Sequence, residues 1–140
     1  MALAMDVEAL HAFLAEHFTQ VAGDFTVEAV GEHRITVRLN VAERHLRPGG
    51  TVSGPSMFAL ADVGVYLAIL AMIGPKALSV TTSSSLDFMR KPAAHADLIA
   101  EVRLLKLGKV LAVGEVLIFS EGMEAPVARS NMTYSIPPKR

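Results

Sequence analysis

Residues 49–62 of the chain, GGTVSGPSMFALAD, join a glycine-rich segment to the start of the most apolar run in the sequence. Pro55 suits the first turn of a helix, and the Gly-Pro pair at residues 74–75 suits its end. The pattern therefore predicts a helix over residues 55–72. Asp62 lies near its middle. Because burying an unpaired charge costs roughly several kcal/mol, this carboxylate requires an explanation.

Amphipathic segments lie on both sides of this helix. Apolar residues at helical spacing predict a short helix over residues 6–19. Alternation of apolar and polar residues predicts six strands, which cover residues 24–30, 33–40, 77–89, 96–107, 109–119 and 125–136. The first two strands form a hairpin, and the short connections between the last four indicate an antiparallel meander.

The apolar helix must be enclosed, because it is hydrophobic on every face. Its predicted length, about 27 Å, is close to that of a ten-residue strand, about 33 Å. The predicted fold class is therefore α+β, with a long central helix wrapped by a curved antiparallel sheet of about six strands. One such domain accounts for residues 1–140.

A membrane span over residues 57–73 is the alternative for this helix. That segment is at the short limit for crossing a bilayer, and Asp62 inside it would cost about 2.5–3.5 kcal/mol. The amphipathic strands on both sides favour a helix in a protein core instead.

Composition excludes several classes of function. The chain has no cysteine, which excludes disulfides and thiolate zinc sites. A net charge of −1 with 19% charged residues, and no Trp, gives no indication of nucleic-acid binding. Four histidines lack metal-ligand spacing, so we expect surface positions and no metal; they are His11, His17, His33 and His95.

The first ten residues lack a basic segment and contain Asp6 and Glu8, which a signal peptide would not. We therefore expect a cytoplasmic protein. The hydrophobic content, 51%, is high for a soluble monomer, so we expect apolar surface between subunits of a homo-oligomer.

The opening stretch resembles the loop-to-helix signature of the hotdog-fold acyl-CoA thioesterases, in particular the phenylacetic-acid-degradation (PaaI-like) group. The pattern of that group has a loop Asn, a glycine, a His followed by two glycines, and a helix acid. Gly50 matches the first glycine, Gly54 the glycine after the His, and Asp62 the acid, without a gap. The segment LDFMRKPA at residues 86–93 is similar to the aromatic-x-Arg-Pro strand end of the family.

The resemblance implies an acyl-CoA thioesterase. Asp62 would be the nucleophile or general base, and the backbone N–H of Gly54 would polarise the thioester carbonyl. Thr81 would orient water, with Thr82 as its neighbour because the register is uncertain by one residue. Coenzyme A enters as part of the substrate, and no other cofactor is implied.

Further residues of the loop, the helix start and the strands are candidates for substrate binding. They are Arg47, Ser53, Pro55, Thr82, Arg90 and Lys91, and Arg44 and His45 could also meet the phosphates of coenzyme A.

Three positions depart from the family pattern. Ser53 stands in place of the His, Pro55 in place of the second glycine, and Arg47 in place of the loop Asn. Pro55 removes an N–H group but leaves that of Gly54. Ser53 cannot supply the charge of the His, and its alternative role is to cap the helix.

The distance between Gly54 and Asp62 along the predicted helix indicates how many chains form the site. Eight residues separate Gly54 from Asp62, which corresponds to about 12 Å. One chain therefore cannot bring both groups to the same carbonyl. Two antiparallel helices across a two-fold axis can, and the family implies such a shared site. We expect a homodimer, and a homotetramer built from two dimers.

Two other functions remain open. A hydratase of the same fold would need a His with a carboxylate near the helix start, where Ser53 stands. A non-catalytic acyl-CoA binding or sensing protein would bind the same ligands without hydrolysis. The sequence does not choose between a short-chain and an aryl acyl group.

Overall fold

The computed structural model describes residues 3–75 and 79–138. Two α-helices, two short 3₁₀ helices and six strands follow one another along the chain. They are α1 (Val7–His17), η1 (Ala22–Asp24), β1 (Phe25–Gly31), β2 (Arg34–Leu39), η2 (Glu43–His45), α2 (Gly54–Ile73), β3 (Val80–Phe88), β4 (Leu98–Leu107), β5 (Leu111–Ser120) and β6 (Ala128–Ser135). Each predicted helix and strand is present, although residues 77–78 of the third predicted strand lie outside the described residues.

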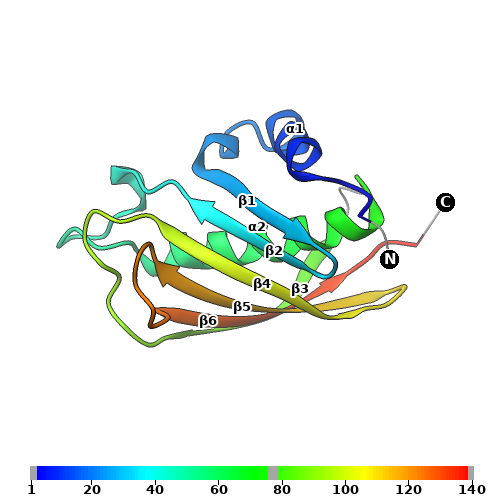
Figure 1. The fold of residues 1–140 in the computed structure, drawn as a ribbon. Coiled ribbons are helices and arrows are strands. Elements are labelled where there is room, and N and C mark those ends of the chain that lie inside the picture. The colour runs from blue at the N-terminus through cyan, green and yellow to red at the C-terminus, as the bar shows by residue number, and fades with distance from the viewer. Residues whose placement is uncertain (1–2, 76–78, 139–140) are drawn as a thin grey trace.

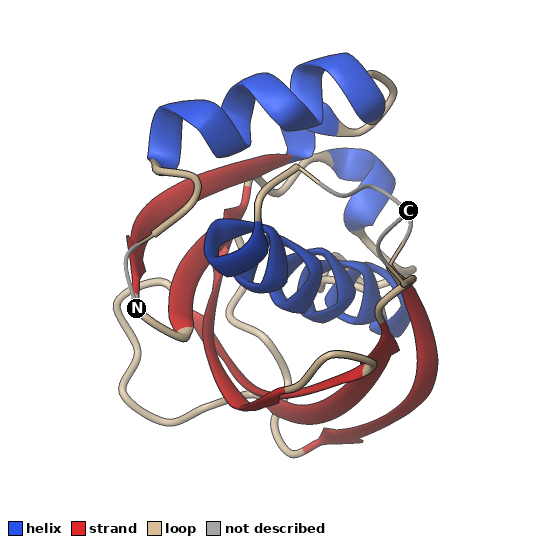
Figure 2. Cartoon of the chain, turned by 90° about the vertical axis from the view of Figure 1, so that its right-hand side faces the viewer, coloured by secondary structure: helices blue, strands red, loops and turns tan. Residues whose placement is uncertain are grey.

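The six strands form one antiparallel sheet in the order β1-β2-β4-β5-β6-β3. The sheet curves around α2, while α1 lies beside β1 at one edge (Figures 1 and 2). The predicted class, a curved antiparallel sheet around a long central helix, is confirmed.

The prediction of a continuous meander for the last four strands is wrong. Strand β3 pairs with β6 at the far edge, and β4 pairs with β2. The reason is the length of α2, which carries the chain along the inner face of the sheet before β3 begins. Strand β4 then returns to the edge that β2 left open. Among the last four strands, therefore, only β4, β5 and β6 follow one another as neighbours.

Both helices begin at side-chain caps. Asp6 precedes α1 and accepts a hydrogen bond from the backbone N–H of Ala9 at 2.9 Å. Ser53 precedes α2, which ends at Gly74 in a positive-φ conformation (97°) that favours glycine. These signals explain why the helix boundaries follow the predictions to within one or two residues.

Helix α2 forms the centre of the core. Its length and composition would allow it to cross a membrane, but 67% of its most apolar window is buried inside the protein. Its fully buried side chains include Leu60, Leu67 and Ile69. This burial on several sides is that of a core helix enclosed by a sheet.

Two glycines allow α2 to lie close to the sheet. A Cβ at Gly64 would lie 2.9 Å from a methyl group of Val102, and a Cβ at Gly114 would lie 2.9 Å from both methyl groups of Val65. Since real Cβ atoms do not approach carbon atoms so closely, the helix-to-sheet spacing depends on glycine at both positions.

We predict that Gly114→Ala destabilises the fold by about 1–3 kcal/mol, because the new methyl group overlaps Val65 in a packed core. Urea unfolding of the wild type and the variant measures this difference. Gly23→Ala is the matched control, because no atom lies within 4 Å of the position that its Cβ would take. Equal unfolding midpoints for Gly114→Ala and Gly23→Ala would contradict the packing described above.

Candidate active site

A cleft of about 390 Å³ opens beside the middle of α2. It is formed by α1, the segment that follows α1, α2, the start of β3 and the end of β6. Its lining residues are Leu14, Phe18, Val21, Asp62, Val63, Tyr66, Ser79, Val80, Thr81 and Tyr134. Apolar side chains predominate, and Asp62 is the single carboxylate among these described residues.

Asp62 accepts two short hydrogen bonds through one carboxylate oxygen. The hydroxyl of Thr81 donates to Oδ1 at 2.6 Å, and the phenol oxygen of Tyr134 lies 2.6 Å from the same atom. The phenol oxygen is also 2.8 Å from the backbone carbonyl of Asp62. The half-buried carboxylate is therefore held by two hydroxyl groups rather than by a basic side chain.

The register of β3 decides which threonine reaches Asp62. Thr81 pairs with Tyr134 across the two strands, and a register shift follows between Thr81 and Ser83. Thr82 lies at this irregularity, and its hydroxyl donates to the backbone carbonyl of Thr133 at 3.3 Å. The structure thus brings Thr81 to Asp62 and leaves Thr82 outside the cleft lining.

Tyr134 was not among the predicted site residues. Its side chain is 3% exposed, and burial together with the hydrogen bond to Asp62 raises its pKa well above the usual range. The available signal was the inward position of a tyrosine on a strand, because a buried phenol requires a hydrogen-bond partner. Identifying that partner required the strand pairing, which the sequence pattern does not contain.

The start of α2 leaves one donor available. Ser53 caps the helix, since its hydroxyl accepts from the N–H of Ser56 at 3.3 Å, and the N–H of Met57 bonds the Ser53 carbonyl at 3.1 Å. Pro55 has no N–H. The N–H of Gly54 makes no hydrogen bond to any residue that the structure describes. It is therefore the free donor at this helix end.

Gly54 also needs to be small. A Cβ at this position would lie 3.2 Å from the ring of Phe88, at the end of β3. The helix start is thus in contact with the edge strand, and a side chain at position 54 would have to displace this aromatic ring.

An ion-pair cluster around the buried Asp24 holds the loop that precedes α2. Asp24 is 8% exposed; it pairs with Arg44, and its Oδ2 lies 3.2 Å from Nε2 of His45. The carbonyl of His45 accepts from the N–H of Ser53 at 2.8 Å, which connects the cluster to the helix cap. Burial raises the pKa of Asp24, but the Arg44 guanidinium and the His45 ring beside the carboxylate outweigh this effect and leave that pKa below its usual value.

This cluster corrects two predictions. The prediction that His45 faces the phosphates of coenzyme A is wrong, because His45 is 6% exposed. Arg44 pairs with Asp24 but keeps an exposed side chain, so its contact with the phosphates stays a prediction. Asp24 is the first residue of the strand predicted over residues 24–30, whereas it lies in η1 and is buried. The histidine and the aspartate can be buried because each has a charged or polar partner.

The other predicted basic residues lie outside the cleft lining. Arg47 is exposed on a tight turn whose glycines, Gly49 and Gly50, have φ values of 106° and 87°. Arg90 donates to the carbonyl of Pro126 at 2.7 Å, and Lys91 is exposed. Their contact with substrate stays a prediction.

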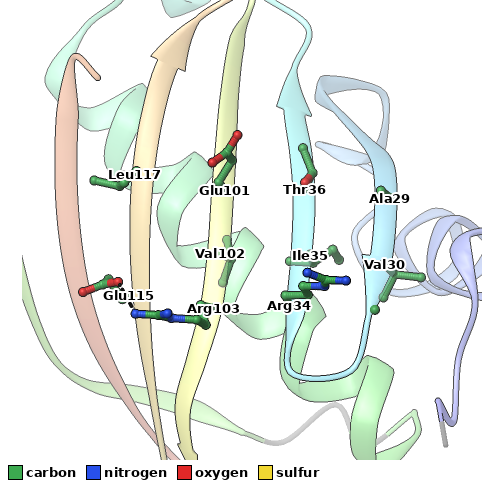
Figure 3. Close-up of a pocket in the computed structure, with 11 residues that line it drawn as sticks. Ala29, Val30, Arg34, Ile35, Thr36, Glu101, Val102, Arg103, Glu115 and Leu117 are labelled. Carbon is green, nitrogen blue, oxygen red and sulfur yellow. Dashed lines mark hydrogen bonds and ion pairs between the residues drawn. The ribbon is translucent and has the colours of Figure 1, made fainter. Parts of the chain in front are cut away.

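A second hollow, of about 620 Å³, lies on the sheet face that points away from α2 (Figure 3). An exposed ion pair between Arg103 and Glu115, 3.2 Å apart, crosses it. None of the described residues that line it is a predicted site residue. We therefore place the candidate active site in the smaller cleft, at Asp62.

Comparison with known proteins identifies the family of the chain. Residues 49–127 match the thioesterase superfamily. The structure of a presumed thioesterase from Silicibacter sp. TM1040 is 64% identical, with a TM-score of 0.93, and the match covers 99% of this chain and 96% of that one. A presumed esterase of Pseudomonas aeruginosa is 27% identical over 125 residues, which are 89% of this chain and 92% of the relative.

A variant of the phenylacetic acid degradation protein PaaI from Thermus thermophilus is 25% identical, with a TM-score of 0.72, over 85% of this chain and 99% of that one. The chain belongs to the thioesterase superfamily. The predicted resemblance to hotdog-fold thioesterases, PaaI among them, is confirmed, and so is the enzyme class, a thioester hydrolase.

We predict that Asp24→Asn destabilises the protein by about 1–3 kcal/mol at pH 7, because the buried carboxylate loses its ion pair with Arg44 and its charge beside His45. Because folding lowers the pKa of Asp24, its carboxylate stabilises the folded protein at pH values above its usual pKa of about 3.8. This stabilisation is lost as the pH falls through the pKa that Asp24 has in the folded protein. The difference between the two proteins should therefore shrink below about pH 4.

Urea midpoints measured from pH 7 to pH 3 test this prediction. Asp87→Asn is the control, because Asp87 forms an exposed pair with Arg129 and should change stability by less than about 1 kcal/mol. A difference for Asp24→Asn that stays constant over the whole pH range would show that the carboxylate charge is not what stabilises the loop.

Proposed function

We propose that the protein hydrolyses an acyl-CoA thioester, with Asp62 as general base or nucleophile. The observation that carries this proposal is a carboxylate in an apolar cleft, held by hydroxyl groups and not neutralised by a basic side chain of the described residues. Such a group can take a proton from water or attack a carbonyl carbon directly.

In the general-base route, Asp62 takes a proton from water, and the water oxygen forms a bond to the thioester carbon. The carbonyl oxygen becomes an oxyanion, which the free N–H of Gly54 and the positive end of α2 stabilise. The C–S bond then breaks, and the thiolate of coenzyme A receives the proton from Asp62. In the nucleophilic route, the Asp62 carboxylate attacks the thioester carbon, and the C–S bond breaks to leave an anhydride on Asp62. Water then hydrolyses the anhydride, and the released thiolate receives a proton from that water.

The two groups must come from different chains in this proposal. Eight residues of helix separate Gly54 from Asp62, or about 12 Å. Strand β3 is a sheet edge with exposed apolar side chains; Val80 is 57% and Phe88 55% exposed. Pairing of this edge with a second copy would cover both residues and place two α2 helices across a two-fold axis.

The cleft favours a compact apolar acyl group. Leu14, Phe18, Val21 and Val63 line it beside Asp62, and its volume is about 390 Å³. A short-chain or aryl acyl group matches this size and polarity.

The exposed side chains of Arg47, Arg90 and Lys91 stay our candidates for the phosphates of coenzyme A, outside the cleft.

One observation favours a second candidate function. The hydroxyl of Ser53, which stands in place of the family His, is engaged in capping α2. No group at this position replaces the charge of the His. A protein that binds acyl-CoA without hydrolysing it is therefore the alternative.

We predict that Asp62→Asn lowers turnover by about 10²–10⁴-fold, because an amide can neither accept the proton nor attack the carbonyl. A panel of acyl-CoAs, from acetyl-CoA to phenylacetyl-CoA, measures this. Glu115→Gln is the control, since its carboxylate lies on the outer sheet face. Binding of the panel without hydrolysis by the wild type would support the alternative, and full activity of Asp62→Asn would refute the site.

A further inference from the structure

The two hydrogen bonds to Asp62 are distributed unequally over its carboxylate. Thr81 and Tyr134 both approach Oδ1, each at 2.6 Å. Among the described residues, none makes a hydrogen bond to Oδ2. The two oxygens of the same side chain therefore have different surroundings.

Several contacts fix Tyr134 in place. Its side chain is 3% exposed, and its ring lies 6.2 Å from that of Tyr66. Its phenol oxygen also lies 2.8 Å from the backbone carbonyl of Asp62. The phenol is thus held against both the side chain and the backbone of the same residue on α2.

We propose that Tyr134 is a positioning residue, which with Thr81 occupies Oδ1 of Asp62 and leaves Oδ2 as the reactive oxygen. This inference rests on the proposed role of Asp62. Oδ2 is the oxygen that takes the proton from water or attacks the thioester. Tyr134 itself acts through Asp62 and makes no bond to the substrate.

The phenol suits this role better than a basic side chain would. Burial and the contact with Asp62 raise the pKa of Tyr134 above the usual range, so it stays protonated and remains a donor at neutral pH. A phenol donates a hydrogen bond without placing a positive charge beside the carboxylate. Asp62, Tyr66 and Tyr134 are the titratable groups among the described residues that line the cleft.

Replacing Tyr134 with Phe removes one hydroxyl and keeps the ring. A hydrogen bond to a charged group corresponds to about a 10–100-fold effect on rate. We expect kcat to fall by about this factor with little change in KM. The acidic limb of the pH–rate profile should move to higher pH, because the ionised carboxylate loses a donor.

Ser130→Ala is the matched control. Ser130 is also a buried hydroxyl on β6, and it donates to the carbonyl of Ser85 at 2.8 Å, away from the cleft. It should lower stability without moving the pH–rate profile. Urea unfolding of both variants separates loss of folding from loss of positioning.

The Tyr134→Phe change in an Asp62→Asn background decides between positioning and direct action. If Tyr134 acts only through the carboxylate, it should not reduce the residual rate of Asp62→Asn any further. A full additional loss would mean direct contact with substrate and overturn the inference. An unchanged rate and pH profile for Tyr134→Phe alone would also overturn it. An active Asp62→Asn protein would instead refute the proposed function.

A spectroscopic measurement does not depend on the Tyr134→Phe variant. The chain has two tyrosines, so 3-fluorotyrosine gives two fluorine signals, and Tyr66→Phe assigns them. The signal of residue 134 should shift through the acidic limb of the pH–rate profile in the wild type and stay constant in Asp62→Asn. The same shift in both proteins would contradict the contact with the carboxylate.

Discussion

Helix α2 is apolar on every side, and the rest of the structure depends on keeping water away from it. Leu60, Leu67 and Ile69 have no exposed surface, and the sheet achieves this by curving around the helix. Gly64 and Gly114 let helix and sheet come into close contact. The one charged side chain of α2, Asp62, opens toward a cleft instead of the sealed core. The cost of burying its charge is reduced accordingly.

The enclosure of α2 also limits how Gly54 and Asp62 of one chain can act together. Because α2 is a rigid rod, Gly54 and Asp62 stay about 12 Å apart in one chain. Within one chain, the surroundings of each group suit its proposed role, although the two groups lie apart. The helix start leaves the Gly54 N–H free, and the middle of the helix presents a carboxylate supported by Thr81 and Tyr134. A second copy of the chain would bring its Gly54 N–H close to Asp62.

The sequence predicts the helices and strands well, because each is specified by local signals such as the cap at Ser53, the Gly-Pro pair after α2 and the alternation within strands. It predicts strand order poorly. The pairing of β3 with β6 depends on where in the fold the chain leaves the end of α2, and no local sequence pattern contains this information. Thr81 follows from the family resemblance, whereas its partner Tyr134 depends on this pairing and could not be predicted. The buried state of Asp24 likewise depends on Arg44 and His45, which are distant in sequence.

Subunit complementation tests the central claim, a site shared between two chains, most directly. Gly54→Pro removes the free N–H and displaces the ring of Phe88, while Ser53 already has the extended backbone that precedes a proline (φ −75°, ψ 156°). Gly54→Pro and Asp62→Asn should each retain at most about 1% of the wild-type activity alone. A dimer that combines one chain of each contains one intact pair, so we predict about half of the wild-type activity for purified mixed dimers. Mixed dimers as inactive as either parent would contradict the account.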